Sequence, residues 1–356
     1  MSKGRVSPIA EPLVLPHLVL QNRVVRSATA NGMADERGYV TAPQVELYRR
    51  LTAGEIGLIV TGHCFICPEG IASPGQTGIH EPGCLPGLAE IASLAGGSLS
   101  KMAVQLNHAG AKAPFAHQPV GPAAICLRKD GKAARLLEAG EMKGIVEAFV
   151  QAALLGKQAG FAGVQVHLAH GYLLSQFLDP LYNTREDGYG RTAEGRFRLA
   201  GEVLEGIKAA CGEAFPVFVK MNITTGGEDD AFEEDAAAYL NLLADCGVEA
   251  AELSGHIVRK RGNRDRLYFL ERAARLRKKT SLPLMLVGGI RTLGEMEQVL
   301  AAGIQMVSLC RPFICEPDLV PRLLGGQEGA RCVGCEQCFA RTAEGVRNCV
   351  FHRPNE

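Results

Sequence analysis

The chain has 356 residues, enough for one large domain or two ordinary ones, and its 47% hydrophobic and 21% charged residues exclude a disordered or low-complexity protein. Its 38 Lys and Arg residues balance 38 Asp and Glu residues, which leaves a net charge of zero. We therefore expect neither a nucleic-acid nor a membrane partner, because no basic excess is present to bind an anionic backbone or lipid surface.

The compartment is inferred from the N-terminus and the cysteines. Pro8, Glu11, Pro12 and Pro16 interrupt the first apolar stretch, which argues against a signal peptide. The sequence has no run of about 18 apolar residues without a charge, so we expect no membrane span. The 12 cysteines do not form the dense framework of a small secreted protein, so we expect a reducing cytoplasm.

The predicted elements begin with a small hairpin at Pro12–Gln21. Continuous apolar runs, which are typical of strands in a parallel sheet covered on its outer face, follow it. They are Arg23–Ser27, Gly57–Gly62, Met102–Asn107, Val164–His167, Pro216–Asn222, Glu249–Gly255, Pro283–Gly289 and Met306–Cys310.

Segments of helical period separate these runs. Thr41–Gln44 and Thr292–Glu295 have the spacing of capping boxes at helix starts. Gly160, Gly247 and Gly303 stand where helix ends favour a positive φ. Helices and strands are therefore expected to alternate along the chain.

Eight strands, each followed by a helix, over roughly 300 residues predict an α/β fold of the (β/α)8 TIM barrel type. We expect the barrel to cover residues 1–330, with the hairpin at its floor, and a short Cys-rich C-terminal tail to cover residues 331–356. A doubly wound open sheet is the alternative, but no G-x-G-x-x-G fingerprint follows the first strand. The long loop Ala109–Gly140 after the third strand is expected to form a wall of the substrate site.

Three polar rings follow the fourth predicted strand: His167, His170 and Tyr172. Active sites of such barrels lie at the C-terminal ends of the strands. Neutral imidazoles can donate hydrogen bonds to a carbonyl oxygen, and a phenol can deliver a proton. For an isolated His-x-x-His pair, a helix cap or a metal site would be the alternatives.

The seventh and eighth strands end in Gly288-Gly289 and Cys310-Arg311. Loops after these strands commonly bind phosphate, with Gly allowing close approach and Arg forking onto the oxygens. Gln105 and Lys220 end the third and fifth strands and could face a polar ring system or serve as buried structural partners.

Taken together, these motifs resemble the old yellow enzyme family of FMN-dependent ene reductases, in the branch related to 2,4-dienoyl-CoA reductase. The matching stretches cover the barrel from end to end. They are Asn22–Thr29, Gln105–Gly110, His167–Leu178, Leu286–Arg291 and Arg311–Phe313.

The resemblance implies an FMN site across the barrel mouth, with NAD(P)H as reductant. His167 and His170 would bind the electron-withdrawing group of the substrate, and Tyr172 would donate the proton. The residues implied to hold FMN are Ser27, Ala28, Thr29, Gly62, Gln105, Lys220, Gly288, Gly289 and Arg311. Lys220 departs from the family pattern, since relatives usually have Arg there, and Lys lacks the planar fork.

The tail contains Cys332, Cys335, Cys338 and Cys349 in the pattern C-x2-C-x2-C-x10-C. Thiolates at this spacing can bind a [4Fe–4S] cluster or zinc, and the resembling branch carries a four-Cys cluster at this place. We expect a metal centre there; the alternative is a reduced tail without metal. His352 is a substitute ligand or a solvated tail residue.

The expected function is reduction of an activated C=C bond by an FMN-dependent, NAD(P)H-using oxidoreductase. Alternatives are an amine-demethylating flavoprotein, disfavoured because Trp is absent and only 7 Tyr are present, and a flavin- or metal-holding electron-transfer scaffold. The expected partners are a small-molecule substrate, the nicotinamide cofactor and a second copy of the chain in a homo-oligomer.

Overall fold

The computed structural model describes residues 7–128, 130–225, 232–256, 266–339 and 348–351. Eight parallel strands form a closed barrel, because β4 pairs with both β3 and β6 at the two ends of the strand order. These strands are β3 (Val24–Arg26), β4 (Leu58–Val60), β6 (Lys101–Asn107), β9 (Gly163–Leu168), β10 (Val217–Asn222), β11 (Ala250–Ser254), β12 (Leu284–Val287) and β13 (Met306–Leu309). The predicted TIM barrel is confirmed, and each predicted strand overlaps one of them. A short additional strand, β5 (Cys64–Phe65), pairs with the end of β6.

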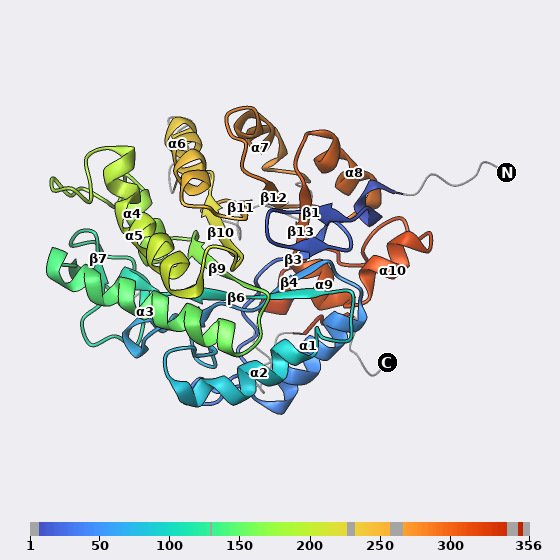
Figure 1. The fold of residues 1–356 in the computed structure, drawn as a ribbon, viewed down its shortest axis with the longest axis horizontal. Helices are drawn as coiled ribbons and strands as arrows, with labels where there is room; N and C mark the ends of the chain where they lie inside the picture. Colours follow the sequence, from blue (N-terminus) through green and yellow to red (C-terminus); the bar gives the residue numbers. More distant parts are fainter. Residues whose placement is uncertain (1–6, 129, 226–231, 257–265, 340–347, 352–356) are drawn as a thin grey trace.

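Helices surround the strands (Figure 1). The longer ones are α1 (Ala42–Ala53), α2 (Leu85–Ser93), α3 (Ala139–Gln158), α5 (Ala193–Cys211), α6 (Phe232–Asp245), α7 (Leu270–Arg277) and α8 (Leu293–Ala301). Shorter ones are α4 (Leu173–Leu178), α9 (Arg311–Cys315) and α10 (Leu319–Leu324). Because this layer covers the outer face of the strands, β9, β10 and β11 are buried along their whole length, as their continuous apolar runs predict.

The capping predictions are confirmed in part. The hydroxyl of Thr292 accepts a hydrogen bond from the N–H of Glu295 at 3.2 Å and completes the box at α8. The box predicted at Thr41 is wrong: its hydroxyl donates to the carbonyl of Met33 at 2.7 Å and does not cap α1. The carbonyl of Met33, which lies outside the motif, thus binds the Thr41 hydroxyl that the local pattern predicted to cap the helix.

The predicted glycine conformations at the helix ends are confirmed. Gly160, Gly247 and Gly303 have φ values of 91°, 69° and 85°. These left-handed conformations favour glycine because it has no Cβ.

The hairpin expected at Pro12–Gln21 closes the barrel floor. Its strands β1 (Leu13–Val14) and β2 (Val19–Leu20) pair antiparallel. Leu20 is fully buried in one apolar cluster with Phe218 and Met285, which belong to barrel strands. In the turn, the backbone N–H of His17 donates to the buried Glu249 carboxylate at 2.6 Å. The hairpin therefore supplies the apolar side chains that fill the lower end of the barrel.

The loop from β6 to α3 contains the short strands β7 (Val120–Gly121) and β8 (Arg135–Leu136), which pair in parallel. Ala109, Ala113 and Ala116 form a small buried cluster in this loop, and Tyr172 packs against it. The loop thus forms a wall beside one of the predicted catalytic rings.

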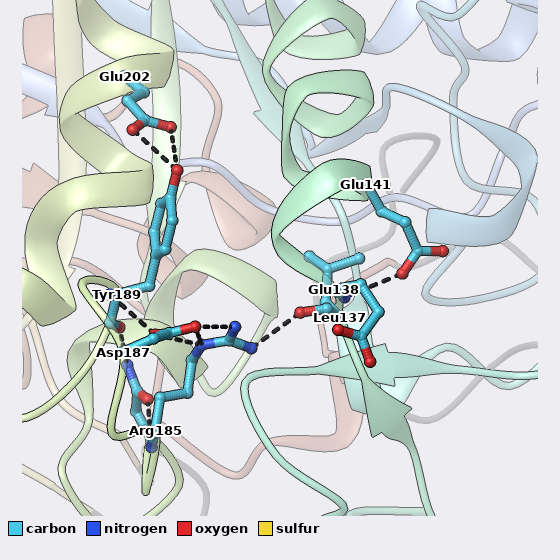
Figure 2. Close-up of polar contacts among 8 residues, drawn as sticks. Leu137, Glu138, Glu141, Arg185, Asp187, Tyr189 and Glu202 are labelled. Carbon is cyan, nitrogen blue, oxygen red and sulfur yellow. Dashed lines mark hydrogen bonds and ion pairs between the residues drawn. The ribbon is translucent and has the colours of Figure 1, made fainter.

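A buried arginine connects the end of this loop to the segment between α4 and α5. Arg185 lies between α4 and α5 and donates to the carbonyl of Leu137, just before α3, at 2.8 Å (Figure 2). Its Nε donates to Asp187 at 2.9 Å, and the N–H of Tyr189 donates to the same carboxylate at 3.0 Å. One side chain thus connects the loop before α5 to the start of α3.

Among the residues that the structure describes, no helix combines the length and the apolar character that a membrane span requires.

Candidate functional site

The end of β9 places the three predicted rings together. The ring centroid of His167 lies 5.1 Å from that of His170 and 5.3 Å from that of Tyr172. His167 is still in the strand, whereas Tyr172 is the residue before α4. The sequence expectation that these side chains lie together is met.

The turn between β9 and α4 holds His170 in an unusual backbone conformation. His170 has a φ of 62°, which is uncommon for a residue with a Cβ. Its backbone N–H donates to Oδ1 of Asn222 at 3.1 Å, and its Nε2 lies 3.0 Å from the hydroxyl of Ser254. Contacts from β10 and β11 therefore fix both the backbone and the ring.

Both imidazoles are held in their neutral form. Burial, followed by the charge of neighbouring His170, lowers the pKa of His167 well below its usual value. Burial, followed by the charge of Lys220, does the same to the pKa of His170. A neutral imidazole can donate one hydrogen bond without bringing a buried positive charge to the substrate. The Nδ1 atom of His167 is buried and has no hydrogen-bond partner among the described residues.

Three further side chains at this site were missed from the sequence. The ring of His63 lies 6.4 Å from that of His167, centroid to centroid. Nζ of Lys112 donates to the carbonyl of His170 at 2.7 Å. Nε2 of His256 lies 3.2 Å from the hydroxyl of Tyr182. His63 and His256 each follow the last residue of a predicted strand, and this position was the signal that could have found them.

A chain of hydrogen bonds crosses the barrel below these rings. Nε2 of Gln105 donates to Gln165 at 2.7 Å, and Nε2 of Gln165 donates to Glu252 at 3.1 Å. Nζ of Lys220 donates to Glu252 at 3.2 Å and to the hydroxyl of Ser27 at 2.6 Å. The structure thus connects Gln105, Lys220 and Ser27, which were predicted as cofactor residues, through two buried residues that were not predicted.

The first two strands approach each other closely where they end. A Cβ on Gly62 would lie 2.9 Å from the carbonyl oxygen of Thr29, so only glycine fits there. The hydroxyl of Thr29 donates to the carbonyl of Ser27 at 2.9 Å, and Ala28 packs against the apolar cluster inside the barrel. These four predicted residues therefore form one edge of the barrel mouth.

The predicted phosphate side contains more positive charge than expected. Gly288 and Gly289 follow β12 with φ values of 141° and 69°. Arg311 begins α9, where its Nη1 lies 3.3 Å from Glu336 of the tail. Arg291 is buried, and burial, followed by the charge of Arg266, lowers its pKa. The sequence motif contains Arg291, whereas Arg266 and Arg311 approach it only in the fold, where they pair with Glu295 and Glu336.

These features fit an FMN molecule across the barrel mouth. The Gly288-Gly289 turn, Arg291 and Arg311 would hold its phosphate, because positive charge and close backbone approach favour an anion. Gln105 and Lys220 would offer hydrogen-bond donors to its ring system. The structure also shows that the positive charge of Lys220 is countered by the buried carboxylate of Glu252, a partner that the sequence did not reveal.

The four tail cysteines gather around one cavity of about 40 Å³. Cys315 from α9 lines it as well, although the sequence placed this residue among the scattered cysteines. Burial, followed by the nearby Cys349 thiol, raises the pKa of Cys315. Within the described part of the chain, however, no three His, Cys, Asp or Glu side chains are placed to hold a metal ion. The metal centre stays a prediction, and His352 lies outside the described residues.

Comparison with known proteins decides the family. The model of the NADH:flavin oxidoreductase / NADH oxidase family matches residues 8–329. The chain belongs to this family. The resemblance to old yellow enzymes is confirmed.

Several relatives illustrate the range of the family. The chain is 27% identical over 333 residues to an NADH oxidase of Thermoanaerobacter brockii, covering 90% of this chain and 51% of that protein. An old yellow enzyme homologue from Zymomonas mobilis is 25% identical, with a TM-score of 0.80 and coverage of 95% of this chain and 98% of the other. Morphinone reductase is 26% identical, with a TM-score of 0.77 and coverage of 90% and 91%.

A 2-naphthoyl-CoA reductase shares the fold, with a TM-score of 0.83 at 24% identity; the alignment covers 90% of this chain and 52% of that one. The chain thus spans about half the length of the NADH oxidase and of this reductase.

Proposed function

We propose that this protein reduces an activated C=C bond, such as that of an α,β-unsaturated carbonyl compound, with NAD(P)H as the electron source. The observation that carries the proposal is the group of His167, His170 and Tyr172 at the end of β9, with both imidazoles held neutral by burial. FMN, when bound, supplies the hydride that none of the protein's side chains can provide.

The side chains have separate tasks in this reaction. His167 and His170 donate hydrogen bonds to the carbonyl oxygen of the substrate and stabilise the negative charge that develops on it. Tyr172 donates a proton to the carbon next to that carbonyl group. The C=C bond thereby gains one hydride and one proton. The alanine cluster of the β6–α3 loop packs against Tyr172.

The substitution Tyr172→Phe tests the proton donor. We expect reoxidation of the reduced flavin by an enone to slow by about 10²–10⁴-fold, which is the usual contribution of a general acid. Reduction of the flavin by NAD(P)H should change little, because that step needs no proton from Tyr172. Stopped-flow absorbance measures the two half-reactions separately.

Tyr189→Phe is the matched control, because its hydroxyl donates to Glu202 on the outer helical layer, outside the site. An equal loss of both half-reactions in Tyr172→Phe would contradict the assignment of the proton donor.

We further propose that the tail cysteines bind a metal centre, either [4Fe–4S] or zinc, as the gathering of Cys332, Cys335, Cys338 and Cys349 around one cavity supports. Elemental analysis of anaerobically purified protein should find stoichiometric iron or zinc. Cys338→Ser should lose it, whereas Cys126→Ser, in an exposed loop, should keep it. Metal-free wild-type protein with intact thiols would contradict this proposal.

The proposal also includes a cytoplasmic location and a homo-oligomeric state. None of the 12 cysteines, all of which lie in the described residues, forms a disulfide, which fits a reducing compartment. Size-exclusion chromatography with light scattering measures the oligomeric state directly.

A further inference from the structure

His63 lies at the site although neither the sequence motifs nor the proposed mechanism use it. It follows Gly62 at the end of the barrel's second strand. Its ring stacks against that of His167, with an interplanar angle of 16° and a centroid separation of 6.4 Å. The ring of Tyr172 is 5.6 Å away on the same measure. His63 therefore contacts two of the three proposed catalytic rings.

The side chain of Gln76 fixes the orientation of this imidazole. Oε1 of Gln76 accepts a hydrogen bond from the backbone N–H of Ala72 at 2.7 Å. A backbone N–H can only donate, so the amide oxygen must lie on this side. Nε2 of Gln76 lies 3.2 Å from the carbonyl oxygen of His63, which can only accept. Two backbone groups thus independently identify the oxygen and the nitrogen of the amide.

The same amide nitrogen lies 2.7 Å from Nδ1 of His63. Because the NH2 group donates, Nδ1 must accept and carries no proton. The proton of the neutral ring is then on Nε2, on the side of the ring that points away from Gln76. Gln76 is buried, so water does not compete for this hydrogen bond.

We propose that His63 is a third imidazole donor of the site, held as the Nε2–H tautomer by Gln76, and that it binds a second acceptor atom of the group that activates the substrate. His63 and His170 both contact the ring of His167, so the three imidazoles form a row of contacting rings. A row of donors suits an activating group with two acceptor oxygens, such as a nitro group or a 1,2-dicarbonyl, better than a single ketone. This inference rests on the proposed function and specifies its substrate class.

Nuclear magnetic resonance of ¹⁵N-histidine-labelled protein tests the tautomer without any turnover. Two-bond ¹H–¹⁵N correlations distinguish an Nε2–H ring from an Nδ1–H ring, and the signals that disappear in His63→Gln identify His63. We expect the Nε2–H pattern in the wild type and a mixture of tautomers in Gln76→Leu. An Nδ1–H pattern in the wild type would overturn the donor assignment.

Binding and turnover test the second acceptor. His63→Phe keeps a ring beside His167 and Tyr172 but removes the donor, whereas His63→Gln keeps an N–H donor. For a nitroalkene, His63→Phe should lower kcat/KM and weaken binding to the oxidised flavoprotein by about tenfold, and His63→Gln should stay within about threefold of the wild type. For a simple enone, the loss in His63→Phe should be smaller than for the nitroalkene, because a single carbonyl oxygen offers His63 no second acceptor atom. Flavin reduction by NAD(P)H serves as the control.

Equal losses for the nitroalkene and the enone, or a loss in His63→Gln as large as in His63→Phe, would overturn the inference. Failure of the proposed function looks different. In that case the wild-type protein would reduce neither substrate, while the resonance pattern and the binding of the nitroalkene, followed by the flavin absorption, would still decide the role of His63.

Discussion

Lys220 and Glu252 form a buried ion pair between neighbouring strands of the barrel. Their Nζ and Oε1 atoms lie 3.2 Å apart, and their side chains are 4% and 0% exposed. A buried ion pair loses hydration on both sides, so its net contribution to stability is small while it is intact. Its effect on the site is larger, since the carboxylate counters the positive charge of Lys220.

Removing one partner of this pair should cost more than removing both. Glu252→Leu leaves the Lys220 ammonium buried without its carboxylate, and we expect the free energy of unfolding to fall by about 3–5 kcal/mol. The double variant Lys220→Met/Glu252→Leu should lose less than Glu252→Leu alone, and therefore less than the sum of the two single variants. Urea denaturation of the four proteins measures the difference. Strict additivity would show that the two groups do not interact.

At the scale of elements, the strands were predictable, and the contacts between groups that are distant in the sequence were not. The apolar runs predict all eight barrel strands because a strand buried on both faces leaves a continuous hydrophobic signal in the sequence. The capping box at Thr292 followed from its local spacing, whereas Thr41 has the same spacing but is used by a loop carbonyl. Local patterns determine an element only where no distant group competes for the same atoms.

The Arg185 contacts are such a distant connection, and they provide a test. Arg185→Leu removes the donor to the carbonyl of Leu137 and leaves Asp187 without its arginine partner. We expect a loss of about 2 kcal/mol in the free energy of unfolding, measured with urea. Arg135→Leu is the control, because the ion pair of Arg135 with Glu141 is exposed and should contribute less than about 1 kcal/mol. Equal losses of unfolding free energy in the two variants would contradict the prediction that burial makes the Arg185 contacts more stabilising than those of Arg135.

At the scale of the whole molecule, the barrel encloses histidines that the unfolded chain exposes to water. Burial lowers the pKa of His108 to about 4, and burial, followed by the charge of Lys112, lowers that of His256 to about 4. The folded protein keeps these rings neutral, whereas the unfolded chain protonates them near pH 6.5. Stability is therefore complete above pH 6.5 and falls as the pH drops towards 4.

This linkage predicts an acid-sensitive fold. Each such histidine should lower the free energy of unfolding by about 2 kcal/mol between pH 7 and pH 5. Nδ1 of His108 accepts a hydrogen bond from the N–H of Gly110 at 3.0 Å. The substitution His108→Gln keeps an acceptor for this N–H, but the glutamine side chain cannot be protonated. Urea denaturation at both pH values should therefore show a smaller loss in His108→Gln than in the wild type. An unchanged pH dependence would exclude His108 as a contributor.

Much of the candidate site was also predictable. His167, His170 and Tyr172 are close in sequence, so any turn after the strand brings them together. Gly288 and Arg311 lie after successive strands, which a parallel barrel places side by side. Gln165, Glu252 and Arg291 were not identified, because nothing in their neighbourhood distinguishes a polar residue in a strand or turn from one that faces a cofactor.

By itself, the sequence determined the order of strands and helices, the barrel they form and the identity of the rings after the fourth strand, since periodicity and spacing are local properties of the chain. Only the tertiary structure decided which polar groups share a proton or a charge. His63 meets Gln76 through a folded loop, Lys220 meets Glu252 across two strands, and Cys315 joins the tail cysteines around one cavity. Hydrogen bonds and ion pairs act over a few ångströms in space, whatever the separation of their groups along the chain.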